Sequence, residues 1–248
     1  MSKTDDEREA NQRKLEGVGR PEKSGTARQN PEAGVDVVLP DANREWDLHS
    51  VQFGETPIDE DVRDYLTEQC QGIVTKDELN LAESENIFEA MEWLQEHPFG
   101  APSELLNQVA LRDLHRRMFD HVWTWAGQVR TRETNMGIDP LQITHEWQIA
   151  LGNAEWQIEH DACASEEVCV RLHRRMLKIH CFPNGNGRHA RLVANELGRI
   201  LGLGSNAFTW GRQTGEGREE ELRRQYLDAI KLADATDNYI PLIKIALS

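Results

Sequence analysis

The chain has few basic residues and no long apolar run. Its 248 residues include 28 Lys and Arg against 43 Asp and Glu, for a formal net charge of −15. Such a surface would repel a polyanion, so we expect no direct nucleic-acid partner. No stretch approaches the roughly 18 consecutive apolar residues that a membrane-spanning helix needs, and the first residues, MSKTDDEREANQRK, lack the apolar core of a signal peptide. We therefore expect no membrane partner.

Cysteine is also scarce. The four cysteines have irregular spacing and form no CxxC pair, which argues against a disulfide framework and a cysteine-based zinc site. The nine histidines likewise include no HExxH motif. We predict a reducing, cytoplasmic location.

Composition divides the chain near residue 50. Residues 1–33 carry seven bases and seven acids with almost no large apolar side chain, so they cannot bury enough surface to offset the entropy of ordering. We predict a largely disordered extension over residues 1–50, either a solvated arm without a role or a partner-binding arm. Residues 51–248 are predicted to form one domain.

Helical periodicity dominates that domain. Thr75 and Glu78 have the spacing of a capping box, and Leu79, Ile87, Ala90, Met91 and Leu94 fall near one face of a helix over residues 76–96. Further helices are predicted at 103–120, 141–160, 166–179, 187–201 and 217–234. Turn-forming residues between Trp125 and Leu141 predict a small inserted hairpin. The fold class is therefore all-α with a short β-hairpin flap.

The most informative stretch is His-Cys-Phe-Pro-Asn-Gly-Asn-Gly-Arg-His-Ala-Arg at 180–191. Gly185 and Gly187 permit the positive φ angles that turn backbone N–H groups inward at the start of a helix, where anions bind. Arg188 and Arg191 lie in the first turn of that helix, where the helix dipole disfavours cations unless an anion offsets them. We predict an anion site, for phosphate or a carboxylate, with His180 close enough to accept a proton.

This stretch resembles the signature of the Fic/DOC family, His-x-Phe-x-Asp/Glu-Gly-Asn-Gly-Arg-x-x-Arg. It matches at seven positions: His180, Phe182, Gly185, Asn186, Gly187, Arg188 and Arg191. The segment from Leu114 to Thr131 resembles the helix that leads to the family's flap, and residues from about 53 onward resemble the bacterial subgroup called mobile mystery protein B.

The resemblance implies an all-helical Fic fold and a protein nucleotidyltransferase that moves AMP from ATP, or from another nucleoside triphosphate, to a Ser, Thr or Tyr hydroxyl of a protein target. His180 would be the catalytic base, and Phe182 would anchor the loop. Gly185, Asn186, Gly187, Arg188 and Arg191 would bind the phosphates. The flap would dock the target through Thr131, Arg132, Glu133, Thr134, Asn135 and Met136.

One position departs from the signature. Asn184 stands where the family commonly has the Asp or Glu that binds Mg²⁺ or Mn²⁺, and an amide oxygen can ligate a metal but brings no charge. ATP-driven transfer is one hypothesis for this site. The alternatives are a nucleotide-binding regulatory module with little metal-dependent turnover, or a phosphodiester-cleaving, deAMPylating protein.

A second resemblance concerns regulation. Many Fic proteins carry an inhibitory helix that ends in Glu-Gly or Glu-Asn, and Glu85-Asn86 in the predicted helix 76–96 matches this ending, although Leu81 stands at the usual Ser/Thr position. The functional hypothesis pairs Glu85 with Arg191, and a regulatory partner protein is a further candidate partner. The alternative is an ordinary solvated glutamate on an acidic helix.

Overall fold

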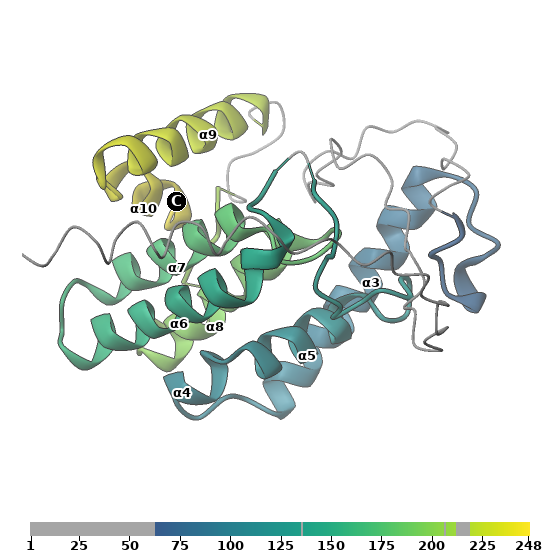
Figure 1. Ribbon diagram of the computed structural model, residues 1–248, viewed down its shortest axis with the longest axis horizontal. Coiled ribbons are helices and arrows are strands. Elements are labelled where there is room, and N and C mark those ends of the chain that lie inside the picture. The colour runs from purple at the N-terminus through teal and green to yellow at the C-terminus, as the bar shows by residue number, and fades with distance from the viewer. Residues whose placement is uncertain (1–62, 135, 206, 212–218) are drawn as a thin grey trace, which may run out of the picture. The chain divides into compact units, whose positions relative to one another are not determined.

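The computed structural model describes residues 63–134, 136–205, 207–211 and 219–248 (Figure 1). All of them belong to one compact unit, Val38–Ser248. The predicted extension at residues 1–50 and the flap residue Asn135 lie outside the described residues. The regular elements in the described part are helices, together with a single isolated bridge between Leu66 and Trp123.

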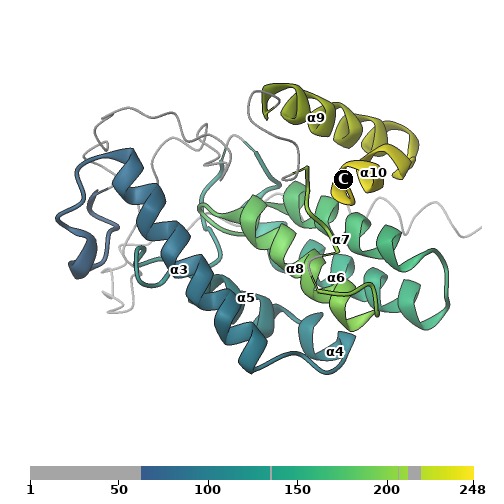
Figure 2. The same ribbon diagram turned by 180° about the vertical axis from the view of Figure 1, so that it is seen from behind.

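Helix α3 (Lys76–Glu96) begins where the sequence predicts. The Thr75 hydroxyl accepts a hydrogen bond from the Glu78 N–H, and the Glu78 carboxylate accepts one from the Thr75 N–H, so both bonds of the capping box are present. A short 3₁₀ turn, η1 (Glu68–Cys70), precedes this helix. The buried apolar face of α3, which includes Leu79 and Ile87, packs towards α5 (Figure 2).

The predicted helix 103–120 is two helices, α4 (Pro102–Leu105) and α5 (Gln108–Phe119). They separate at Asn107, whose side-chain oxygen accepts a hydrogen bond from the Ala110 N–H at 2.9 Å and caps the second helix. Capping therefore overrides the apolar periodicity that runs across the break.

Three helices form the body that holds the candidate loop. They are α6 (Ile143–Glu159), which follows the 3₁₀ turn η2 (Pro140–Gln142), then α7 (Ser165–Ile179) and α8 (Asn186–Ile200). Helix α7 packs against both α6 and α8. Buried side chains such as Val170 on α7 and Val193 on α8 belong to the hydrophobic core of the described part.

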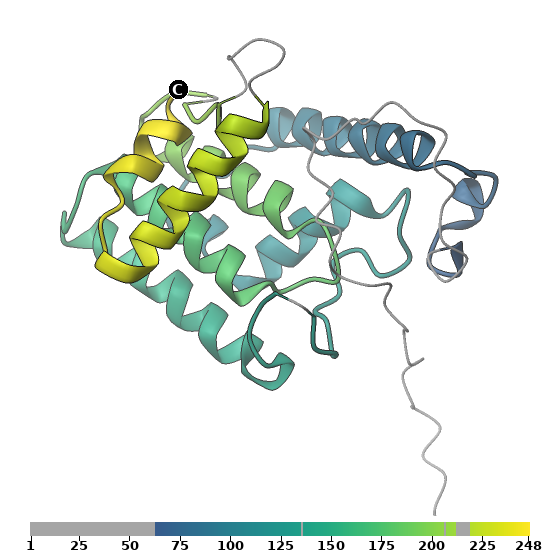
Figure 3. The same cartoon turned by 90° about the horizontal axis from the view of Figure 1, so that it is seen from above.

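Helices α9 (Glu219–Thr236) and α10 (Ile240–Ala246) pack together, and α10 contacts α7 (Figure 3). Arg171 on α7 donates two hydrogen bonds to Asp237, at 2.8 and 3.0 Å, and Arg174 pairs with Asp234. These ion pairs attach the end of α9 to α7. Helix α10 was not predicted, because seven residues are too few to show a clear helical period.

The segment between Trp125 and Leu141 differs from the predicted hairpin. Its described residues form turns and bends rather than paired strands, and residues 131–134 and 136–138 are called the flap below. None of the helices in the described ranges is long and apolar enough to cross a membrane.

Candidate functional site

The loop between α7 and α8 takes its shape from two left-handed residues. His180, the C-cap of α7, has φ 55°, and Gly185, the N-cap of α8, has φ 76°. A Cβ atom on Gly185 would lie 2.5 Å from the Phe119 ring, so only glycine fits there. Gly187 differs from the prediction: it has no positive φ and lies inside α8, which begins one residue earlier than expected, at Asn186.

Phe182 and Asn186 fix this loop in the core. The buried Phe182 ring stacks on His115, with ring centroids 3.7 Å apart. The Asn186 side chain accepts a hydrogen bond from the Phe182 N–H at 2.9 Å and donates one to the Phe182 carbonyl at 2.8 Å. The Asn186 side chain therefore forms its hydrogen bonds within the loop. Asn186 would hold a ligand through its backbone N–H.

His115 holds the same loop from α5. Its Nδ1 accepts a hydrogen bond from the Gly127 N–H, and its Nε2 lies 3.0 Å from the Asn184 carbonyl. Because an N–H only donates and a carbonyl only accepts, the ring proton is on Nε2. Complete burial lowers the pKa of His115 well below its usual value, so the neutral form that makes both contacts is the stable one.

The His180 imidazole is suited to accept a proton. It is buried, and its Nδ1 has no hydrogen-bond partner in the described part of the chain. Burial first, and the nearby Arg130 charge second, lower the pKa of His180 to about 4. The ring is therefore neutral at physiological pH, and an arriving anion would raise this pKa.

Arg188 is a buried cation with unused donors. Its Nη1 lies 2.8 Å from Glu83 Oε2, and both side chains are almost fully buried. The second Glu83 oxygen accepts a hydrogen bond from Trp123 Nε1 at 2.6 Å. The Nε and Nη2 atoms of Arg188 have no hydrogen-bond partner among the described residues. Unsatisfied buried donors are costly, so these two atoms mark a place where an anion would be stabilised.

Arg191 lies on α8 one turn after Arg188 and is half-buried. Its charge contributes, after burial, to lowering the pKa of His173 on α7 to about 3. The structure thus places both arginines of the motif, together with Gly185 and the first N–H groups of α8, at one end of this helix.

Asn184 provides little for a metal ion. Its side-chain oxygen accepts a hydrogen bond from the Gly185 N–H at 2.7 Å. In the described ranges, no group of three or more His, Cys, Asp or Glu side chains could hold a metal. Since Mg²⁺ in proteins is bound through carboxylates and phosphates, the donors that this loop presents do not fit a protein-held Mg²⁺ site.

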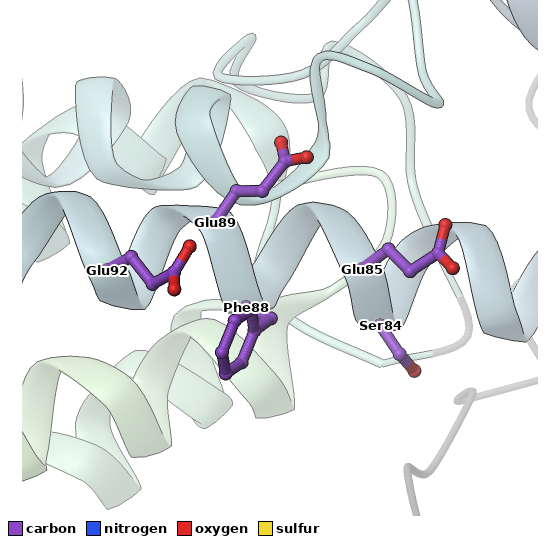
Figure 4. Close-up of a pocket in the computed structure, with 5 residues that line it drawn as sticks. All are labelled: Ser84, Glu85, Phe88, Glu89 and Glu92. Carbon is purple, nitrogen blue, oxygen red and sulfur yellow. The ribbon is translucent and has the colours of Figure 1, made fainter.

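The two predicted regulatory residues, Glu85 and Asn86, differ in their burial. Glu85 is exposed on α3 beside Ser84, Phe88, Glu89 and Glu92 (Figure 4). Asn86 is buried; its amide donates to the Arg117 carbonyl, and its oxygen accepts from the His121 N–H.

The carboxylate of α3 that reaches an arginine of the loop is thus Glu83, which pairs with Arg188, and not Glu85. The sequence contained a signal for it, because Glu83 lies four residues from both Leu79 and Ile87, on the buried face of the helix.

The flap presents mostly exposed residues. Thr131, Glu133 and Met136 are exposed, whereas Arg132 and Thr134 are half-buried. The Thr134 hydroxyl donates to the Met136 carbonyl. Both ends of the flap contact the buried side chain of Arg130, which belongs to the segment Leu114 to Thr131.

Residues 105–197 match the model of the Fic/DOC family, and this range contains α5, the flap and the loop with its two arginines. This part of the chain is therefore similar to the Fic/DOC family. The comparison with curated proteins finds no similar sequence.

Solved structures share the fold. BepC from Bartonella tribocorum, solved with AMPPNP, is 18% identical, with a TM-score of 0.54 over 74% of this chain and 94% of that one. The N-terminal Fic domain of a Bartonella quintana effector, solved with ADP, is 15% identical, with a TM-score of 0.54 over 74% and 92%. Fic-1 from C. elegans (residues 134–508) is 18% identical, with a TM-score of 0.55 over 73% and 51%.

Proposed function

We propose that this protein transfers a nucleoside monophosphate, AMP from ATP in the first instance, to a Ser, Thr or Tyr hydroxyl of a protein target. The observation that carries the proposal is the buried Arg188 side chain, whose Nε and Nη2 donors are unused at the start of the helix that follows neutral His180. A polyphosphate chain supplies the negative charge that such a site lacks.

In the proposed reaction, His180 accepts one proton. Its imidazole accepts the proton of the target hydroxyl while the hydroxyl oxygen attacks the α-phosphorus of ATP. A new P–O bond forms to the target, the bond between the α-phosphorus and its bridging oxygen breaks, and pyrophosphate leaves. The phosphates would be held by the backbone N–H groups of Asn186 and Gly187 and by Arg188 and Arg191, while Gly185, whose N–H donates to Asn184, would shape the turn. Their contribution is positioning and charge stabilisation.

The flap would align the target. Its exposed backbone lies next to His180, because the Ile138 N–H donates to the Ile179 carbonyl at the end of α7. An extended target segment could pair with such a backbone and bring its hydroxyl to the imidazole. The AMPPNP and ADP bound in the two Bartonella structures support the nucleotide half of the proposal for a chain with the same fold.

We further propose that α3 restrains the site through Glu83. The Glu83 carboxylate occupies one donor of Arg188, so the phosphates of a nucleotide must compete with it or share that guanidinium. The regulatory role predicted for Glu85 and Asn86, and the likeness to mobile mystery protein B, remain predictions.

Intact mass spectrometry tests the function. The wild type, His180→Ala and Glu83→Gln are each incubated with the four nucleoside triphosphates and Mg²⁺ or Mn²⁺. We expect an AMP-sized adduct on the chain that is absent in His180→Ala. His160→Ala, which removes an exposed histidine, is the control and should retain the adduct. Absence of both an adduct and calorimetric ATP binding in the wild type and in Glu83→Gln would refute the proposal.

Asn184 favours a second candidate, a nucleotide-binding module with little turnover. This candidate predicts ATP binding without an adduct. Asn184→Asp then separates the two, because a gain of Mg²⁺-dependent adduct would indicate intact transfer machinery that lacks a metal ligand. If the wild type releases AMP from an already modified protein and the variants do not, the activity is phosphodiester cleavage.

A further inference from the structure

Arg130 is a buried arginine whose side-chain hydrogen bonds all go to main-chain carbonyls. It is 3% exposed. Its Nε donates to the His180 carbonyl at 2.6 Å, and its Nη1 donates to the Arg132 carbonyl at 2.8 Å. Its Nη2 donates to the carbonyls of Ile138 and Ile179, at 2.5 and 3.3 Å. One planar guanidinium therefore connects four points of the backbone.

These four carbonyls belong to two parts of the site. Arg132 and Ile138 lie at the two ends of the flap, and Ile179 and His180 form the junction between α7 and the loop. The backbone repeats the connection, since the Arg130 N–H donates to the Cys181 carbonyl at 3.0 Å. Removal of the Arg130 fork would thus leave, among the described residues, only backbone hydrogen bonds, from the Arg130 and Ile138 N–H groups, between this segment and the end of α7.

Gly137 shows how closely the flap packs on this arginine. A Cβ atom at Gly137 would lie 2.6 Å from Arg130 Nη2 and 2.7 Å from the His180 Cβ atom, and its φ is 106°. The flap backbone therefore lies directly on the guanidinium and on the histidine.

His180 needs such support. Its left-handed backbone is unfavourable for a residue with a Cβ atom. Two backbone contacts hold it in this conformation: its N–H donates to the Met176 carbonyl, and its carbonyl accepts from Arg130 Nε. The second contact is the one that also reaches the flap.

We propose that Arg130 is a positioning residue that couples the flap to His180. It keeps the flap, which docks the target, and His180, which accepts the proton, in a fixed position relative to each other. The coupling rests on contacts within the chain. Its consequence for catalysis rests on the proposed function, in which His180 is the base and the flap docks the target.

The variants separate positioning from general stability. Arg130→Lys keeps the positive charge near Glu133, Asp139 and Cys181, the groups that act on this guanidinium, but loses the fork. Gly137→Ala disturbs the same contact from the flap side. Arg112→Lys is the matched control, because Arg112 is exposed and its Nε donates to a single carbonyl, that of Gly127, at 3.1 Å.

Hydrogen–deuterium exchange of the full chain without nucleotide is the test. In Arg130→Lys and in Gly137→Ala we expect exchange at residues 131–138 and 177–182 to rise about tenfold, the effect of losing one charge-assisted hydrogen bond, with α6 and α9 unchanged. The double variant should exchange no faster than the single variants, because both break one contact. Arg112→Lys should match the wild type.

Three outcomes would overturn the proposal: unchanged flap exchange in Arg130→Lys, additive effects in the double variant, or faster exchange throughout the chain in both single variants. The last outcome would make Arg130 an ordinary core residue. If the wild type transfers AMP, Arg130→Lys should lose about tenfold in transfer rate at unchanged ATP affinity. Equal transfer rates would refute the catalytic consequence. If the wild type neither binds nor transfers a nucleotide, the proposed function fails, while the exchange result still decides the coupling.

Discussion

Replacement of Glu83 by Gln tests the buried ion pair with Arg188. The amide oxygen of Gln can still accept the hydrogen bond from Trp123, so the main change is the loss of the negative charge. Removal of one partner from a buried ion pair costs about 3–5 kcal/mol, because the remaining charge is left uncompensated. In a domain of this size each kcal/mol lowers the Tm by about 2–4 °C, so a drop on the order of 10 °C is expected.

Urea unfolding and calorimetry would measure the effect, with Glu85→Gln as the control. Glu85 is exposed on the same helix, so its variant should stay within about 0.5 kcal/mol of the wild type. ATP at about 100 times its Kd should restore roughly 2.7 kcal/mol to Glu83→Gln, because a ligand that binds only the folded state stabilises it by mass action.

A double-mutant cycle decides whether the two side chains are coupled. Arg188→Met removes the cation, and Glu83→Gln with Arg188→Met should lose less stability than the sum of the two single losses. A loss below about 1 kcal/mol in Glu83→Gln, well under the cost expected for breaking a buried pair, would refute the reasoning. An additive cycle would refute it as well.

Three further predictions concern the loop and the pH dependence of stability. Gly185→Ala should cost about 2–4 kcal/mol in urea unfolding, because the new Cβ atom would have a left-handed φ and meet the Phe119 ring; wild-type stability would contradict this packing. Asn184→Asp should keep its contact with the Gly185 N–H and bind ATP more tightly with Mg²⁺ than without it, in a calorimetric titration; equal affinities would argue against a metal ligand at this position. Burial lowers the pKa of His173 and of His189 to about 3, so below the unfolded value of about 6.5 only the unfolded chain takes up these protons. Folding stability should therefore fall as the pH drops from 6.5 towards 3, by about 2 kcal/mol per histidine at pH 5, and a Tm that is constant between pH 7 and pH 5 would contradict this.

Local signals predicted the helices better than the contacts between them. The capping box at Thr75 fixed the start of α3 because both of its bonds lie within four residues. The break at Asn107 was missed, since an asparagine within an apolar period can lie in a helix or cap one. The hairpin expected from the turn residues is a turn-rich segment instead, because it attaches to the end of α7 through Arg130 rather than to a second strand.

Within the site, the motif predicted the loop but not the residues that support it. His180, Gly185 and Arg188 lie together as their spacing in the chain suggests. Glu83 and Arg130 come from distant parts of the sequence, 105 and 50 residues away from their partners Arg188 and His180. They come together only in the folded chain, and the sequence around a charged residue does not indicate such a distant partner.

The backbone contact between His115 and the Asn184 carbonyl has a consequence for how this site can change. The loop is held at position 184 by a main-chain oxygen, and elsewhere by the amide of Asn186 and the ring of Phe182. In the described part of the chain, the one side-chain hydrogen bond at position 184 is the one that the Asn184 oxygen accepts from the Gly185 N–H, and an aspartate oxygen can accept it as well. An asparagine codon becomes an aspartate codon through one base change, so a lineage could gain or lose a carboxylate at this site in a single mutational step that requires no compensating change in the fold.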